Sequence, residues 1–185
     1  MHVFLPIFPR VGILLLLLVA AAAIFDIRYR RIPNWLTASG VVLGVALNSI
    51  IGRPEAGWAF SLEGLTFGFV VYFVLYALHA MGAGDVKLMA AIGAFTGPVN
   101  WFGIFAVSAI IGGVMGLLLA ILRKRLKSTV WNMGFIVGEM TRGRAAFVDK
   151  PELDVKHPKS LGLPHGAVIA VGTALFMAAG WRFAR

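Results

Sequence analysis

Long apolar runs constrain this chain more than any other feature of its sequence. The first extends from Phe4 to Phe25 and contains one charged residue, Arg10. About 20 consecutive apolar residues are enough for a helix to cross the hydrocarbon core of a bilayer. Charged residues make up 14% of the chain, whereas soluble proteins carry about 25%. We therefore predict an all-α protein that is embedded in a membrane.

Five further apolar runs bring the prediction to about six transmembrane helices in a single domain over residues 1–185. These runs are Trp35 to Ile51, Phe60 or Leu62 to Leu78, Val86 to Phe95, Trp101 to Leu122, and Pro164 to Trp181. The fourth is short, because a dozen helical residues reach only about 18 Å. We therefore expect a buried helix that crosses partly and ends at Thr96-Gly97-Pro98.

Glycines in two of these runs predict close helix packing. Gly64 and Gly68 have the four-residue spacing of small residues that lets two backbones approach. Gly103, Gly112, Gly113 and Gly116 in the fifth run are likewise expected to permit close helix contact.

The positive charges predict how the chain is oriented. With six spans, residues 26–34, 80–87 and 123–163 lie on one side and carry 13 of the 17 Lys and Arg residues. Such an excess marks the cytoplasmic side, so both termini are expected outside. We predict a cytoplasmic loop at 123–163 with an interfacial amphipathic helix. The net charge of +9 is attributed to this topology and to anionic lipid, and no nucleic-acid partner is expected.

Cysteine and histidine content narrows the chemistry. The chain has no cysteine, and its four histidines are scattered. Disulfides and thiolate chemistry are excluded, and we expect neither a metal site nor a cofactor.

Two aspartates stand out by position. Asp26 ends the first run, and Asp85 follows the Gly82-Ala-Gly84 turn at the start of the fourth. Acidic residues beside membrane segments are costly and usually functional, and the predicted topology places both on the cytoplasmic face. Simpler interpretations exist: Asp85 as a helix cap, and Asp26 as the surface partner of Arg28 or Arg30.

A pair of carboxylates in one small site supports peptide hydrolysis without a metal. Two like charges held close together share one proton. The ionised aspartate accepts a proton from water, while the protonated one donates a hydrogen bond to the scissile carbonyl. Gly82 and Gly84 are expected to admit a substrate backbone and to adopt conformations that other residues resist. Lys87 is expected to reach the interface, and the roles of His79 and His165 stay open.

Three blocks of sequence resemble the type IV prepilin peptidase family. They are DIRYRRIPN at 26–34, GAGDVKLMAAIGAFTG at 82–97 and LPHGAVIAVG at 163–172. The second contains the family's GxGD motif, and His165 stands where the third usually has Tyr or Phe. The resemblance implies a GxGD membrane peptidase with Asp26 and Asp85 as the catalytic pair. It gives Gly82, Gly84, Lys87, Pro33 and Asn34 supporting places in the motifs.

The same resemblance implies an activity and a location. It implies an aspartic endopeptidase of the bacterial inner membrane that removes the leader peptide of prepilins or pseudopilins at the cytoplasmic face, cutting after a glycine. The short form looks like the tight-adherence (Flp pilus) subgroup. Larger members methylate the new N-terminus and carry paired cysteines, so methyl transfer is not expected here. The pilin substrate and the oligomeric state stay open.

Two other functions are compatible with the apolar chain. Presenilin and signal-peptide-peptidase types also have GxGD, but pair it with an aspartate in the preceding span, and this chain has none between residues 27 and 84. A small membrane transporter or a non-enzymatic pilus-assembly subunit would use both aspartates as ion-coupling or structural groups. Coupling residues usually lie near the bilayer midplane, whereas these two are at segment ends.

Overall fold

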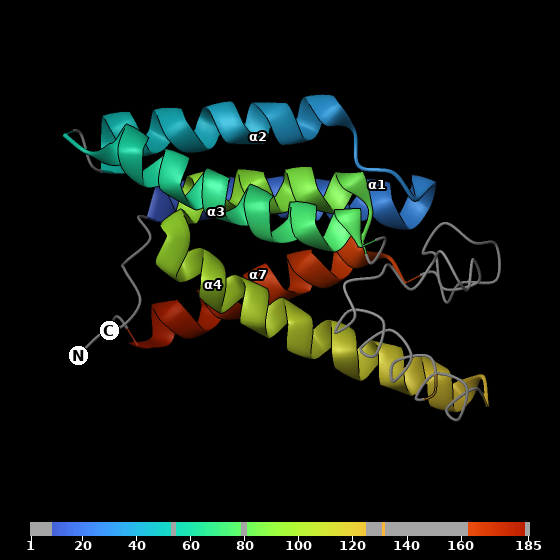
Figure 1. Cartoon of the computed structure of the whole chain (residues 1–185). Coiled ribbons are helices and arrows are strands. Elements are labelled where there is room, and N and C mark those ends of the chain that lie inside the picture. The colour runs from blue at the N-terminus through green and yellow to red at the C-terminus, as the bar shows by residue number, and fades with distance from the viewer. Residues whose placement is uncertain (1–8, 53–54, 79–80, 125–130, 132–162, 184–185) are drawn as a thin grey trace.

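The fold is a bundle of helices running back and forth along one axis (Figure 1). The computed structural model describes residues 9–52, 55–78, 81–124, 131 and 163–183. Within these ranges the ordered elements are helices, and there is no strand. They are α1 (Pro9–Tyr29), α2 (Asn34–Leu47), the π-helical turn η1 (Asn48–Gly52), α3 (Gly57–Ala77), α4 (Ala83–Leu122) and α7 (His165–Phe183).

Helix α4 is in fact two antiparallel segments joined at a sharp bend. Gly97 has φ 68° and ψ 174°, which is not helical, and Pro98 follows it. Proline has no N–H to continue the helical hydrogen bonds. The chain therefore turns back there, as the green and yellow-green ribbon of Figure 1 shows. The prediction that Thr96-Gly97-Pro98 ends the fourth apolar run is confirmed.

Asn48, the first residue of η1, completes the end of the first α4 segment. Asn48 Nδ2 donates to the carbonyl oxygens of Ala94 at 2.9 Å and Phe95 at 3.1 Å, and to Ser61 Oγ at 3.0 Å. The helical partner of the Ala94 carbonyl would be the N–H of residue 98, which proline lacks. Asn48 thus serves the Ala94 carbonyl, which Pro98 leaves without its helical donor, and also the carbonyl of Phe95.

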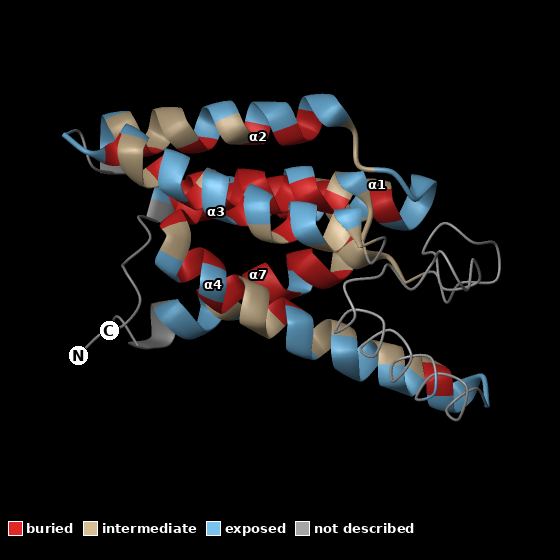
Figure 2. Ribbon diagram, in the orientation of Figure 1, coloured by how far each residue is buried: buried red, intermediate tan, exposed pale blue. Residues whose placement is uncertain are grey.

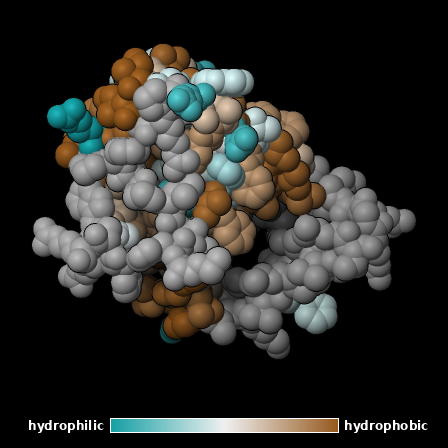
Figure 3. Space-filling model, turned by 90° about the vertical axis from the view of Figure 1, so that its left-hand side faces the viewer, coloured by the Kyte–Doolittle hydropathy of each residue, from teal (hydrophilic) through white to brown (hydrophobic). Residues whose placement is uncertain are grey.

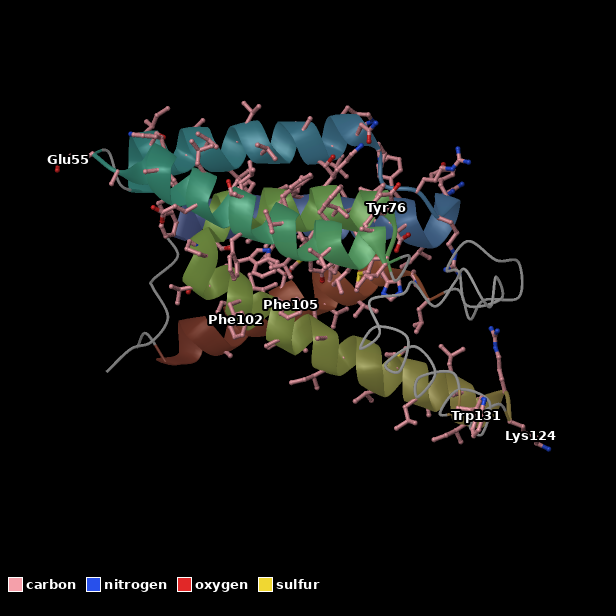
Figure 4. All side chains as sticks on the ribbon, in the orientation of Figure 1. Glu55, Tyr76, Phe102, Phe105, Lys124 and Trp131 are labelled. Carbon is pink, nitrogen blue, oxygen red and sulfur yellow. The ribbon has the colours of Figure 1, made fainter. Side chains whose placement is uncertain are left out.

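Aromatic side chains hold the two α4 segments together. Trp101 Nε1 donates to the carbonyl oxygen of Met89 at 3.0 Å, which links the returning segment to the first. The Trp101 ring stacks on Phe105 and meets Phe67 and Tyr72 edge to face. Figure 4 labels Phe105 on this returning segment.

Close packing is confirmed for the glycines of α3 but not for Gly113 of the returning α4 segment. A Cβ on Gly64 would run into the carbonyl of Gly93, and one on Gly68 would lie 2.7 Å from the Met89 carbonyl oxygen. By contrast, Gly113 has nothing within 4 Å of such an atom, and for Gly112 and Gly116 the nearest atoms are at 3.5 Å and 3.8 Å. Gly112 and Gly116 are thus in ordinary van der Waals contact, and the prediction was wrong for Gly113, because this part of α4 diverges from the bundle (Figure 2).

The apolar surface identifies an integral membrane protein. Four helices are long and apolar enough to cross a bilayer, α7 being shorter over its apolar part, His165–Gly180. Viewed from one end of the bundle, much of the described surface is strongly apolar (Figure 3). The number of six crossings stays a prediction. The predicted loop at 123–163 with its amphipathic helix lies almost wholly outside the described residues.

Candidate active site

Three segments far apart in sequence meet at one end of the bundle. The end of α1, the start of α4 and the start of α7 all lie at the right of Figure 1, while α1 begins and α7 ends at the opposite end. Charged residues mark both ends: Figure 4 shows Glu55 at the left and Lys124 at the right. The three blocks of the sequence resemblance are therefore brought to the same end.

Asp26 lies in the last turn of α1 and faces α7. Its side chain is buried, with 9% of its surface exposed. Its Oδ2 accepts a hydrogen bond of 2.8 Å from the backbone N–H of Gly166. Asp26 therefore does not lie on a solvated face, and the Arg28 guanidinium lies over the Tyr29 ring.

Asp85 lies in the first turn of α4. It is 7% exposed, and its Oδ2 accepts a hydrogen bond of 3.2 Å from the backbone N–H of Gly82, the N-cap residue. The carboxylate thus serves the start of the helix, as in the acidic half of a capping box. The capping interpretation is confirmed for this oxygen, and it leaves the other one free for chemistry.

The two carboxylates are held alike. In each, Oδ2 is bound by a glycine N–H, and within the described part of the chain Oδ1 has no hydrogen-bond partner. The Asp26 charge acts on Asp85, so the pair shares one electrostatic environment. Tyr72, buried at 2% exposure in α3, lies within electrostatic range of Asp85. Each acid therefore has one oxygen without a hydrogen-bond partner among the residues that the structure describes.

The motif glycines provide space rather than unusual backbone conformations. Gly82 has φ −80° and ψ 151°, which any residue adopts, and Gly97 is the only glycine with positive φ among the described residues. The expectation that Gly82 and Gly84 adopt conformations closed to other residues was wrong. A Cβ on Gly82 would lie 3.3 Å from Asp85 Oδ2, and one on Gly84 would lie 3.3 Å from Ile32 Cβ.

Ile32 connects all three segments of the site. Besides facing Gly84 of α4, its Cδ1 lies 3.0 Å from where a Cβ on Gly166 would be. The same Cβ would lie 3.0 Å from Asp26 Oδ2. The connection between α1 and α2 is thus packed between the starts of α4 and α7, beside the carboxylates.

The supporting motif residues Pro33, Asn34 and Lys87 lie at the starts of α2 and α4. Pro33 is the N-cap of α2, and its carbonyl accepts from the N–H groups of Leu36 and Thr37 at 3.2 Å and 3.4 Å. Lys87 Nζ donates to Asn34 Oδ1 at 2.8 Å, at an exposed position. The structure therefore brings these residues together beside the aspartates and joins the starts of α2 and α4.

Two residues beside the carboxylates were not predicted as site residues. In the sequence, Gly166 stands out only as a member of the third block. The partner of its N–H group, Asp26, is 140 residues earlier in the chain. Tyr72 could have been noticed as a phenol inside an apolar run. His165 starts α7 within electrostatic range of Asp26, and His79 lies outside the described residues. No group of three or more possible metal-binding side chains occurs among the described residues.

Such a site can polarise a carbonyl and activate water. One free carboxylate oxygen can accept a proton from water while the other carboxyl, when protonated, donates to a carbonyl oxygen. Burial keeps both groups out of bulk solvent, which strengthens their interactions with a bound substrate.

Known proteins with similar sequences point the same way. The chain is 26% identical over 121 residues to the "Type 4 prepilin-like proteins leader peptide-processing enzyme" of Escherichia coli O78:H11 (strain H10407 / ETEC), covering 60% of this chain and 42% of that protein. It is 32% identical over 114 residues to the "Prepilin leader peptidase/N-methyltransferase" of Bacillus subtilis (strain 168), covering 60% and 44%.

The chain thus aligns with less than half the length of either curated relative. No solved structure matches it significantly. The type IV leader peptidase family matches residues 13–117, which is more than half of the chain and includes both aspartates. On this match, together with the convergence of the three sequence blocks at one end of the bundle, the chain belongs to the type IV leader peptidase family.

Proposed function

We propose that this protein is an aspartic endopeptidase that removes the leader peptide of type IV or Flp-type prepilins, with Asp26 and Asp85 as its catalytic pair. The observation that carries the proposal is the burial of both carboxylates at one end of the bundle, each with one oxygen bound by a glycine N–H and one left open. The family match and the names of the two relatives support the substrate class.

The reaction follows from two carboxyls that share one proton. The ionised carboxylate takes a proton from water as the water oxygen attacks the carbonyl carbon of the leader's last glycine. The protonated carboxyl passes its proton to the carbonyl oxygen, and a tetrahedral diol forms. One hydroxyl then returns its proton as the C–N bond breaks and the leaving nitrogen is protonated. The products are a leader with a free carboxylate and a pilin with a new N-terminus.

The proposed setting is the bacterial inner membrane, with this end of the bundle at the cytoplasmic face. The excess of Lys and Arg in residues 26–34, 80–87 and 123–163 supports that orientation. The aspartates lie at helix ends, where a basic leader in the cytoplasm can reach them. The proposal covers leader removal without methylation, since the resemblance associates methylation with paired cysteines and these 185 residues contain none.

The test is cleavage of a synthetic prepilin by purified protein in detergent or lipid. Asp26→Asn and Asp85→Asn are each expected to abolish cleavage after the leader glycine, because an amide neither accepts nor supplies the proton. Glu63→Gln is the matched control: it removes an exposed acid from α3 and should leave the rate unchanged. A chelator should have no effect, and mass spectrometry should find the product unmethylated.

Three results would contradict the proposal. The first is full cleavage by both aspartate variants, which would leave the pair with a structural or ion-coupling role. The second is loss of cleavage on adding a chelator, which would indicate a metallopeptidase. The third is cleavage at another position, which would contradict the assigned substrate.

A further inference from the structure

We propose that Gly166 is a positioning residue for the Asp26 carboxylate, and that it must be glycine because any side chain there would displace that carboxylate. The inference rests on the proposed function, in which Asp26 acts on substrate. Gly166 itself touches neither water nor substrate in this mechanism. Its role is to fix the place and orientation of Asp26 through the backbone of α7.

The first support is the hydrogen bond itself. The Gly166 N–H lies in the first turn of α7, where backbone N–H groups have no partner within the helix. It donates to Asp26 Oδ2 at 2.8 Å in a buried setting. A carboxylate at this position is also favoured by the helix dipole. One oxygen of Asp26 is thereby fixed, and the rotation that remains for Oδ1 is restricted.

The second support is the absence of room. A Cβ on Gly166 would lie 3.0 Å from Asp26 Oδ2, 3.1 Å from Asp26 Cβ and 3.0 Å from Ile32 Cδ1. These distances are tighter than ordinary van der Waals contacts, so neighbours would have to shift by a few tenths of an ångström. The atoms that must give way are those of the carboxylate and of Ile32. Gly166 lies in the helix α7 without a positive φ, so an alanine there can adopt the same backbone conformation.

The third support is the place of Ile32. It touches the positions of both Gly84 in α4 and Gly166 in α7. A displacement of Ile32 by a side chain at residue 166 would therefore affect α4, which carries Asp85, in addition to the direct effect on Asp26. Small displacements of reacting groups are costly, since misplacement by about 1 Å reduces rates by about a hundredfold.

The expected result for Gly166→Ala is a kcat for prepilin cleavage lower by about tenfold, with KM changed less than about twofold. We expect Gly166→Ala to leave substrate binding unchanged and to alter the position of Asp26 relative to the scissile carbonyl. Gly180→Ala is the matched control, because it lies in the same helix with nothing within 4 Å of the added methyl. It should cleave at the wild-type rate.

A second substitution tests the mechanism of the loss. Ile32→Val removes the Cδ1 atom and keeps the Cβ that faces Gly84. In the Gly166→Ala background it gives the new methyl space to move away from Asp26. The double variant should therefore recover at least about threefold in kcat over Gly166→Ala alone, which a general weakening of α7 would not allow.

The hydrogen bond can be examined without a variant of residue 166. His165-Gly166 is the only His-Gly pair in the sequence, so 13C-carbonyl histidine with 15N glycine gives one NMR signal for this amide. A strong hydrogen bond to a carboxylate places that amide proton downfield, and Asp26→Ala should move it upfield.

Two results would overturn the inference. One is a kcat of Gly166→Ala within twofold of wild type, and the other is a Gly166 amide signal that does not respond to Asp26→Ala. Neither would affect the proposed function as long as Asp26→Asn is inactive. Full cleavage by Asp26→Asn would instead remove the proposed function and this inference with it.

Discussion

Replacing Asn48 is expected to destabilise the bundle more than any other single polar substitution away from the carboxylates. Asn48→Ala removes the donor that serves the Ala94 and Phe95 carbonyls and Ser61 Oγ. Its two N–H protons are divided among three acceptors, so the loss amounts to about two full hydrogen bonds. Asn48 is 4% exposed and Ser61 is fully buried, so water cannot easily replace them.

The size of the effect follows from these contacts. Hydrogen bonds between membrane helices contribute about 0.6 kcal/mol on average and up to about 1.7 kcal/mol. Two such hydrogen bonds from the buried Asn48 amide contribute about 1–3 kcal/mol. Asn48→Asp should cost at least as much, because a carboxyl group offers at most one donor to the same acceptors.

The assay is equilibrium unfolding in mixed micelles with increasing dodecyl sulfate, followed by tryptophan fluorescence. Ser49→Ala is the matched control, since the hydrogen bond that Ser49 Oγ makes among the described residues is local, to the Val45 carbonyl oxygen four residues earlier at 2.8 Å. It should change the free energy of unfolding by less than about 0.5 kcal/mol. If Asn48→Ala loses no more than Ser49→Ala, the account of the α4 bend given above is refuted.

Three further substitutions test the packing around the site. Gly93→Ala should reduce stability strongly, because its methyl would meet the backbone of Gly64, whereas Gly113→Ala should be neutral; equal thermal melting of the two would contradict the predicted contact. Trp101→Phe should cost about 1 kcal/mol in the same unfolding assay, since the ring remains but its 3.0 Å hydrogen bond is lost, and an unchanged midpoint would argue against that bond. Lys87→Met should change the free energy of unfolding by less than about 1 kcal/mol, because its hydrogen bond to Asn34 is exposed. A larger loss would contradict the assignment of this hydrogen bond to the solvent-exposed surface.

The helices and the candidate pair could be read from the sequence for simple reasons. Runs of about 20 apolar residues become helices in a bilayer because a helix satisfies all of its backbone hydrogen bonds within one segment. Pro98 after Gly97 has to interrupt a helix wherever it occurs. An aspartate beside an apolar run is conspicuous because a charged side chain next to the hydrocarbon core of a membrane costs free energy. Local chemistry of this kind needs no knowledge of neighbours.

What only the tertiary structure decided is how these helices face one another. The helices are apolar on all sides, so hydrophobic periodicity does not show which face of α1 or α3 is packed and which meets lipid. For that reason the sequence did not reveal that Gly166 holds Asp26, that Asn48 completes α4, or that Gly113 packs against nothing. These contacts join residues up to 140 positions apart, and they depend on helix rotation and depth, which are set by the packing of the whole bundle.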